Sequence, residues 1–328
     1  MPTHIDALIG DYDSCVRYNL DAINTDMNQF RQNPDSAGVT SFYFGYIMHN
    51  FHMLVYGAIL GGMERIGMEN ATRLNEVLNE DLFEKHPELT PYAESYSALE
   101  VHILVRFGKW KAILEIPLPF DQELMLFRAA SIHFAKGLAH AALGDVENAK
   151  KEAAIFEKLA SHPSAHERLL HNNIISVIFH VDIPMLRGEI AYREKKYDKA
   201  FELLRKAISL QDSLKYDEPW GKMQPIRHAL GGLLLEQGRH EESESVFRED
   251  LKRHPKNPWA LRGLIDCLKK QLSTSTSCKT HSCCESNTSG NRILVRNEIE
   301  ELQDALQIQR ESEWADFDIS VSCACCKS

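Results

Sequence analysis

The chain has 328 residues, of which 44% are hydrophobic and 26% are charged. This balance is typical of ordinary globular proteins and excludes a disordered or collagen-like chain. A formal net charge of −10 disfavours nucleic acids and anionic membranes as partners. The start lacks the features of a secretory signal, and the longest apolar stretch falls below the ~18 residues that a membrane span needs. These features predict a cytoplasmic protein.

The chain opens with a turn sequence close to its start. Gly10-Asp11-Tyr12 is typical of the turn between two helices of a repeat, so Met1 falls inside the first helix of that repeat. A solenoid needs a polar cap at its end, and we therefore expect the chain to begin part-way through a larger protein. We also expect self-association through this uncapped end. The helix after the turn would then lack cover over its apolar residues, which are Tyr12, Cys15, Leu20 and Ile23.

Repeated helical pairs follow. Residues 48–78 predict a helical pair around Gly61-Gly62, and residues 107–114 predict a turn and a second helix. Four later segments show the tetratricopeptide pattern, in which a small residue in one helix precedes a turn and a second, Ala-containing helix. In the clearest copy Gly137 permits close helix packing and Gly144 forms the turn. The other three copies contain Gly188, Gly231 and the pair Trp259 and Gly263.

Apolar residues between these turns recur at i, i+3, i+4 and i+7, as at Phe201, Leu204 and Ile208. This period indicates amphipathic helices, and no segment shows the alternation of a strand. We predict an all-α fold, a right-handed superhelical solenoid of antiparallel helix pairs like that of tetratricopeptide-repeat (TPR) proteins.

The composition divides the chain into three regions. Residues 1–271 carry the helical repeats, residues 272–291 form a Ser/Thr/Cys-rich insert that we predict to be disordered, and residues 292–328 hold the last helix and a Cys-rich tail. The cysteines of the last two regions permit a thiolate metal site or a redox pair, but their clustering favours reduced surface thiols. These cysteines are Cys278, Cys283, Cys284, Cys323, Cys325 and Cys326.

The chain resembles a largely uncharacterised family of TPR proteins from bacteria and some eukaryotes that share motifs outside the repeats. These motifs stand here as Met1-Pro2-Thr3-His4-Ile5, His49-Asn50-Phe51-His52-Met53-Leu54, Val105-Arg106-Phe107-Gly108-Lys109-Trp110, Tyr216-Asp217-Glu218-Pro219-Trp220 with Pro225-Ile226-Arg227, and Trp314-Ala315-Asp316-Phe317-Asp318-Ile319. Members of this family continue upstream of the first motif. The resemblance implies the solenoid fold and carries no established activity.

Two of these motifs contain candidate binding residues. His49 and His52 lie three residues apart on one helix face, so they permit a metal site with His4. The favoured interpretation is that these histidines and Asn50 form hydrogen bonds to backbone groups where a helix meets the irregular opening segment.

The motif around Tyr216 predicts a loop between helices, and loops often carry binding residues. We name Tyr216, Glu218, Trp220 and Arg227 as candidate ligand contacts, although aromatic residues at a groove rim also serve packing.

Catalytic signatures such as a phosphate-binding loop, a G-x-S-x-G elbow or an H-E-x-x-H helix are missing from the sequence. We therefore predict a scaffold that binds a protein or peptide in its concave groove, without catalysis and without a cofactor. The alternative is a metal-binding protein or metalloenzyme built on His4, His49 and His52. The positions expected to face the groove are mostly apolar, which predicts an apolar ligand: Phe134, Leu138, Met185, His228 and Gly232.

Overall fold

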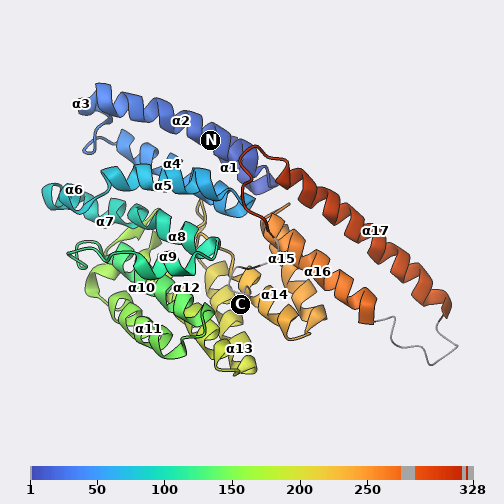
Figure 1. Ribbon diagram of the computed structural model, residues 1–328. Coiled ribbons are helices and arrows are strands. Elements are labelled where there is room, and N and C mark those ends of the chain that lie inside the picture. The colour runs from blue at the N-terminus through green and yellow to red at the C-terminus, as the bar shows by residue number, and fades with distance from the viewer. Residues whose placement is uncertain (1, 275–284, 320–322, 324–328) are drawn as a thin grey trace.

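The computed structural model describes residues 2–274, 285–319 and 323. In this part of the chain the fold is the predicted all-α TPR-like solenoid (Figure 1). None of the helices described is long and apolar enough to cross a membrane. Residues 275–284 of the predicted insert, with Cys278, Cys283 and Cys284, lie outside the described residues, as do Cys325 and Cys326.

The first nine helices form the N-terminal part of the solenoid. They are α1 (Pro2–Ile9), α2 (Tyr12–Gln32), α3 (Pro34–Ala37), α4 (Tyr43–Gly61), α5 (Glu64–Val77), α6 (Glu80–Lys85), α7 (Thr90–Ala93), α8 (Leu99–Arg106) and α9 (Trp110–Glu115), with 3-10 turns η1 (Pro87–Leu89) and η2 (Glu94–Ala98). The antiparallel pairs are α1 with α2, α4 with α5, and α8 with α9.

The remaining helices continue the same arrangement. They are α10 (Leu126–Ala142), α11 (Val146–Ala160), α12 (Ile175–Arg193), α13 (Tyr197–Asp212), α14 (Ile226–Glu236), α15 (His240–Arg253), α16 (Pro258–Thr274) and α17 (Glu285–Arg310). Consecutive helices pair from α10 with α11 to α16 with α17. A 3-10 turn η3 (Pro163–His166) and a two-stranded hairpin, β1 (Leu169–Leu170) and β2 (Asn173–Ile174), precede α12.

The turns within the pairs follow the glycine pattern of the sequence. Gly10 and Gly144 adopt φ values of 77° and 82°, a left-handed conformation that a Cβ disfavours. The aspartates that follow them start the second helices. Asp11 accepts a hydrogen bond from the backbone N–H of Ser14 at 3.0 Å, and Asp145 accepts one from that of Asn148 at 3.2 Å. Such caps satisfy amides that have no partner inside the helix.

The prediction that the apolar face of α2 lacks cover is wrong. Tyr12, Cys15 and Ile23 are fully buried, because α2 packs along α4 and the turn at Gly10 lies against Pro255, just after α15. The Tyr12 hydroxyl donates a hydrogen bond to the carbonyl oxygen of Pro255 at 3.1 Å. Leu20 is partly buried against the same core, so the chain itself covers this face of α2.

Contacts between helices far apart in the sequence show how the first and last pairs meet. The indole Nε1–H of Trp259, in α16, donates to the carbonyl oxygen of Ile59, in α4, at 3.1 Å. The guanidinium of Arg106 lies 3.8 Å from the centre of the same indole. After α17, the carboxylate oxygens of Asp316 accept hydrogen bonds from the first two backbone N–H groups of α5, at 2.7 and 2.9 Å. The solenoid thus curls until α4, α8 and α16 pack together.

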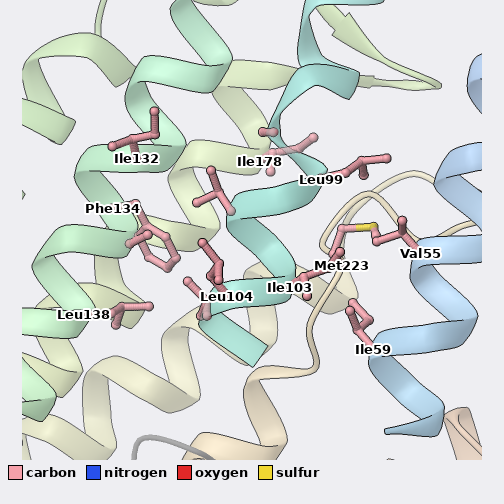
Figure 2. Close-up of a cluster of buried hydrophobic side chains, with 14 of the residues drawn as sticks. Val55, Ile59, Leu99, Ile103, Leu104, Ile132, Phe134, Leu138, Ile178 and Met223 are labelled. Atoms are coloured by element: carbon pink, nitrogen blue, oxygen red, sulfur yellow. The ribbon is translucent and has the colours of Figure 1, made fainter. Parts of the chain in front are cut away.

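The interior of this curl is filled by the chain itself. The segment 214–225, between α13 and α14, places Met223 among apolar side chains from several helices, including Val55 and Ile103 (Figure 2). Lys222 forms a buried ion pair with Asp182 and lies 4.6 Å from the centre of the Phe134 ring. The expectation that the inner-face positions line an open groove is therefore wrong. All five are buried: Phe134, Leu138, Met185, His228 and Gly232.

Close helix packing at glycines provides a test of the repeat register. An ideal Cβ at Gly231 would lie 2.5 Å from the Phe247 ring, and one at Gly263 would lie 2.3 Å from it. Because Phe247 is fully buried between the two glycines, its ring has no space into which to move.

We expect Gly231→Ala to lower the free energy of unfolding by about 1–3 kcal/mol, because overpacking forces the backbone apart. Chemical denaturation measures this change. The matched control is Gly45→Ala in α4, where a Cβ meets nothing within 4 Å; it should raise stability by roughly 0.5–1 kcal/mol. Equal effects of the two substitutions would contradict the packing described here.

Candidate functional site

Two cavities open on either side of His4. The smaller has a volume of about 220 Å³ and lies between α1, α4 and the segment 214–225. We call it the loop pocket; its lining includes Leu8, Met53, Tyr56, Tyr216, Glu218, Trp220, Arg227 and Arg253. The larger has a volume of about 580 Å³ and we call it the aromatic pocket. Its lining is His4, Ser41, Phe42, Phe44, Gly45, Tyr46, His49, Tyr92, Tyr96 and His171.

A hydrogen-bonded chain of three side chains separates the two cavities. His4 Nδ1 lies 2.6 Å from Glu218 Oε2, and His4 Nε2 lies 2.9 Å from His49 Nε2. A carboxylate only accepts hydrogen bonds, so His4 Nδ1 carries a hydrogen. The chain therefore joins α1 and α4 to the segment 214–225 and can hold or move a proton between the pockets.

A second chain lies deeper, beneath the aromatic pocket. The Tyr96 hydroxyl is 3.1 Å from His171 Nδ1, and His171 Nε2 is 2.7 Å from His52 Nδ1. His52 Nε2 is 2.7 Å from the sulfur of Met223, which can only accept. If both rings are neutral, this fixes which atom donates each hydrogen bond. Tyr96 donates to His171, His171 donates to His52, and His52 donates to Met223.

Burial keeps these histidines uncharged. Desolvation, with the neighbouring His4, lowers the pKa of His49 to about 4. Desolvation, with the neighbouring His49, lowers the pKa of His171 to about 4. The pKa of His52 lies well below its usual value for the same two reasons, burial first and His171 second. An imidazolium in this position would lose water contacts without gaining a carboxylate partner.

The loop that carries Glu218 is anchored to the β1–β2 hairpin. Asp217 accepts hydrogen bonds from the backbone N–H of Asn172 and from the side-chain amide of Asn173, both at 3.0 Å. Burial raises the pKa of Asp217 to about 6, although these bonds oppose the rise. The same hairpin turn presents His171, whose φ is 49°. The hairpin thus positions a residue of each hydrogen-bonded chain, Glu218 in the first and His171 in the second.

The structure separates the candidate residues from the sequence into two groups. Glu218, Tyr216, Trp220 and Arg227 line the loop pocket, and His49 lines the aromatic pocket. Asn50 and His52 line neither.

The buried roles of these two residues explain their absence from the pockets. Asn50 donates to Asp26 at 2.8 Å and ties α4 to α2, while His52 is only 1% exposed within the deeper chain.

Three members of the site are not among the candidates expected from the sequence: His171, Tyr96 and Asp217. His171 is followed by two asparagines, a composition that favours a turn, but nothing in the sequence relates this turn to His52. Tyr96 stands in a 3-10 turn with no periodic pattern around it. Only the packing of distant segments brings these residues together.

The proposed metal site on His4, His49 and His52 does not match the geometry. Two nitrogens bound to one tetrahedral zinc lie roughly 3.3 Å apart, whereas the His4 and His49 nitrogens face each other at 2.9 Å. Both nitrogens of His52 already face His171 and Met223. Among the described residues, no group of three or more His, Cys, Asp and Glu side chains is arranged to hold a metal ion.

Comparison with known proteins identifies one repeat. Residues 185–213, which cover the end of α12, the turn at Lys195 and α13, match the tetratricopeptide repeat family. This segment is the second of the four copies recognised in the sequence, that of Gly188. No curated protein matches the chain.

The neutral histidines predict a pH-dependent stability. Their folded-state pKa values lie below those of the unfolded chain, so the unfolded state binds more protons as the pH falls below about 6.5. Each such histidine costs up to about 1.4 kcal/mol per pH unit until its folded pKa is reached, near 4 for His49 and His171. We expect the denaturant midpoint to fall steeply between pH 6.5 and 4.5.

Replacing a member of the cluster checks the cause. His171→Gln should reduce the pH slope, because one ring no longer has to stay neutral. The control His86→Gln removes a partly exposed histidine paired with Glu88 and should leave the slope unchanged. A slope that is the same in the two variants would mean that other groups govern it.

Proposed function

We propose that this chain is a protein-interaction scaffold that holds a peptide segment of a partner protein in the loop pocket. The tetratricopeptide repeat at residues 185–213 supports an interaction role. The observation that carries the proposal is the loop pocket itself, a hollow of about 220 Å³ at the edge of the segment 214–225. We further propose that the chain belongs to the TPR family that shares its Met-Pro-x-His and Tyr-Asp-Glu-Pro motifs, and that it acts in the cytoplasm.

The charges around the loop pocket are already paired. Arg227 donates two hydrogen bonds to Asp212, at 2.8 and 2.6 Å, and Arg253 contacts Asp212 at 3.3 Å and Glu249 at 3.7 Å. Glu218 is paired with His4. Both arginines among the described lining residues are therefore paired with carboxylates, in contrast to scaffolds that grip a terminal carboxylate with free cations.

Apolar groups at the rim supply the remaining contacts. Tyr216 is 62% exposed and Leu8 is 50% exposed, while Trp220 is half-buried behind Tyr216, with their ring centres 6.0 Å apart. Exposed aromatic side chains at the edge of a pocket are typical binding hot spots. We infer a partner peptide that inserts one large apolar side chain between Leu8 and Trp220.

Selection from a random-peptide display library tests the proposal. Peptides retained by the protein should share a Leu, Ile, Phe or Trp anchor, and Trp220→Ala should weaken their binding at least tenfold, about 1.4 kcal/mol.

Leu8→Ala and Leu143→Ala form a matched pair, because the two leucines are 50% and 49% exposed and only Leu8 lines the pocket. Leu8→Ala should reduce the affinity and Leu143→Ala should not. Peptides that bind both variants and Trp220→Ala as tightly as the unmodified protein would show that the loop pocket is not the binding site.

A further inference from the structure

The aromatic pocket is a second site with its own chemistry. Five aromatic side chains line it, and three of them remain open to solvent: Phe42 is 87% exposed, Tyr46 50% and Tyr92 45%. Its volume of about 580 Å³ falls within the roughly 300–1,000 Å³ of pockets that hold small molecules. Rings that serve only the core would be buried, so these exposed rings indicate a ligand with a flat apolar surface.

His49 is the polar group of this pocket with an unassigned nitrogen. Its Nε2 faces His4 at 2.9 Å, and its Nδ1 has no hydrogen-bond partner in the part of the chain that the structure describes. The protonation state of His4 decides the role of this nitrogen. When His4 is neutral, its Nδ1 hydrogen points to Glu218 and its Nε2 accepts from His49, so His49 Nδ1 carries a lone pair.

The opposite state follows when His4 becomes an imidazolium. His4 Nε2 then donates to His49 Nε2, and a neutral His49 must carry its hydrogen on Nδ1. The two states differ by one proton, which enters at His49 Nδ1 and leaves its charge on His4, 2.6 Å from the carboxylate of Glu218. The charge is thus placed on His4, beside its counter-ion Glu218.

We propose that the aromatic pocket binds a small aromatic molecule with a weakly acidic hydroxyl, and that His49 accepts the proton of this hydroxyl through a relay to His4 and Glu218. The step is balanced. The O–H bond of the ligand breaks as an N–H bond forms at His49 Nδ1, while the Nε2 hydrogen of His49 passes to His4 Nε2. The products are a bound phenolate and a His4 imidazolium paired with Glu218.

The other groups around the pocket agree with a neutral ligand that loses its proton after entry. His171 and Tyr96 face it in uncharged forms, since burial lowers the pKa of one and raises that of the other. No Lys or Arg occurs among the described residues that line it, so no fixed cation attracts an anion from solvent. Stabilisation of the phenolate depends on the hydrogen bond from His49.

Binding of 4-nitrophenol to the full chain tests the relay, because its phenolate has a distinct visible absorption. An apolar pocket alone raises the pKa of a phenol by desolvation. The relay has the opposite effect, and we expect the bound probe to deprotonate about one pH unit below the free probe, a tenfold change. 4-Nitroanisole, which has no acidic hydrogen, should compete for the same pocket.

Two substitutions separate the relay from the pocket walls. Glu218→Gln removes the counter-ion of His4, and His49→Phe keeps a ring at the pocket wall but removes its nitrogens; both should abolish the downward shift while 4-nitroanisole still binds. Tyr46→Ala should weaken binding of both probes several-fold. Glu88→Gln, which alters an exposed carboxylate–histidine pair, should change nothing.

Three results would overturn the proposal: no binding of either probe by the unmodified protein, a bound 4-nitrophenol that deprotonates at or above the pH of the free probe, or a full downward shift retained in His49→Phe. Nitrogen-15 NMR of the histidine rings gives an independent readout. On binding of 4-nitrophenol, His4 should change to the imidazolium pattern in the unmodified protein and stay neutral in Glu218→Gln.

Discussion

The buried ion pair between Lys222 and Asp182 is the contact on which the interior of the molecule depends. Both side chains lie among apolar groups, at 5% and 7% exposure, and a charge in such surroundings is tolerated only beside its partner. The pair holds the segment 214–225 against α12 and inserts Met223 into the core (Figure 2). The remainder of the segment then lies where Glu218 meets His4 and Trp220 forms one wall of the loop pocket.

This occupied interior changes how the solenoid can bind. In an open superhelix the first helices of successive repeats form one continuous groove. Here the segment 214–225 fills part of that surface, and two pockets lie around α1, α4 and this segment. Binding is therefore expected in compact pockets that accept a side chain or a small molecule, and not along an extended groove.

The histidines serve stability and binding through the same property. Because burial holds His49, His52 and His171 neutral, each ring has one donor and one acceptor, and the two hydrogen-bonded chains can form. The neutral rings pack closely, with ring centres of His52 and His171 4.9 Å apart. Protonation of these histidines in acid lowers the free energy of unfolding. The protonation state of the pocket histidines is therefore coupled to the stability of the domain.

The sequence by itself determined the helices, their turns and their pairing, because these depend on local signals: apolar residues at helical spacing, and Gly-Asp turns such as Gly144-Asp145. It also named Glu218 and His49 without relating them. Only the tertiary structure decided that they meet through His4, that His171 and Tyr96 join them, and that the inner face is closed. These contacts span up to 214 residues between His4 and Glu218, and no periodicity in the chain encodes which distant segments will pack against each other.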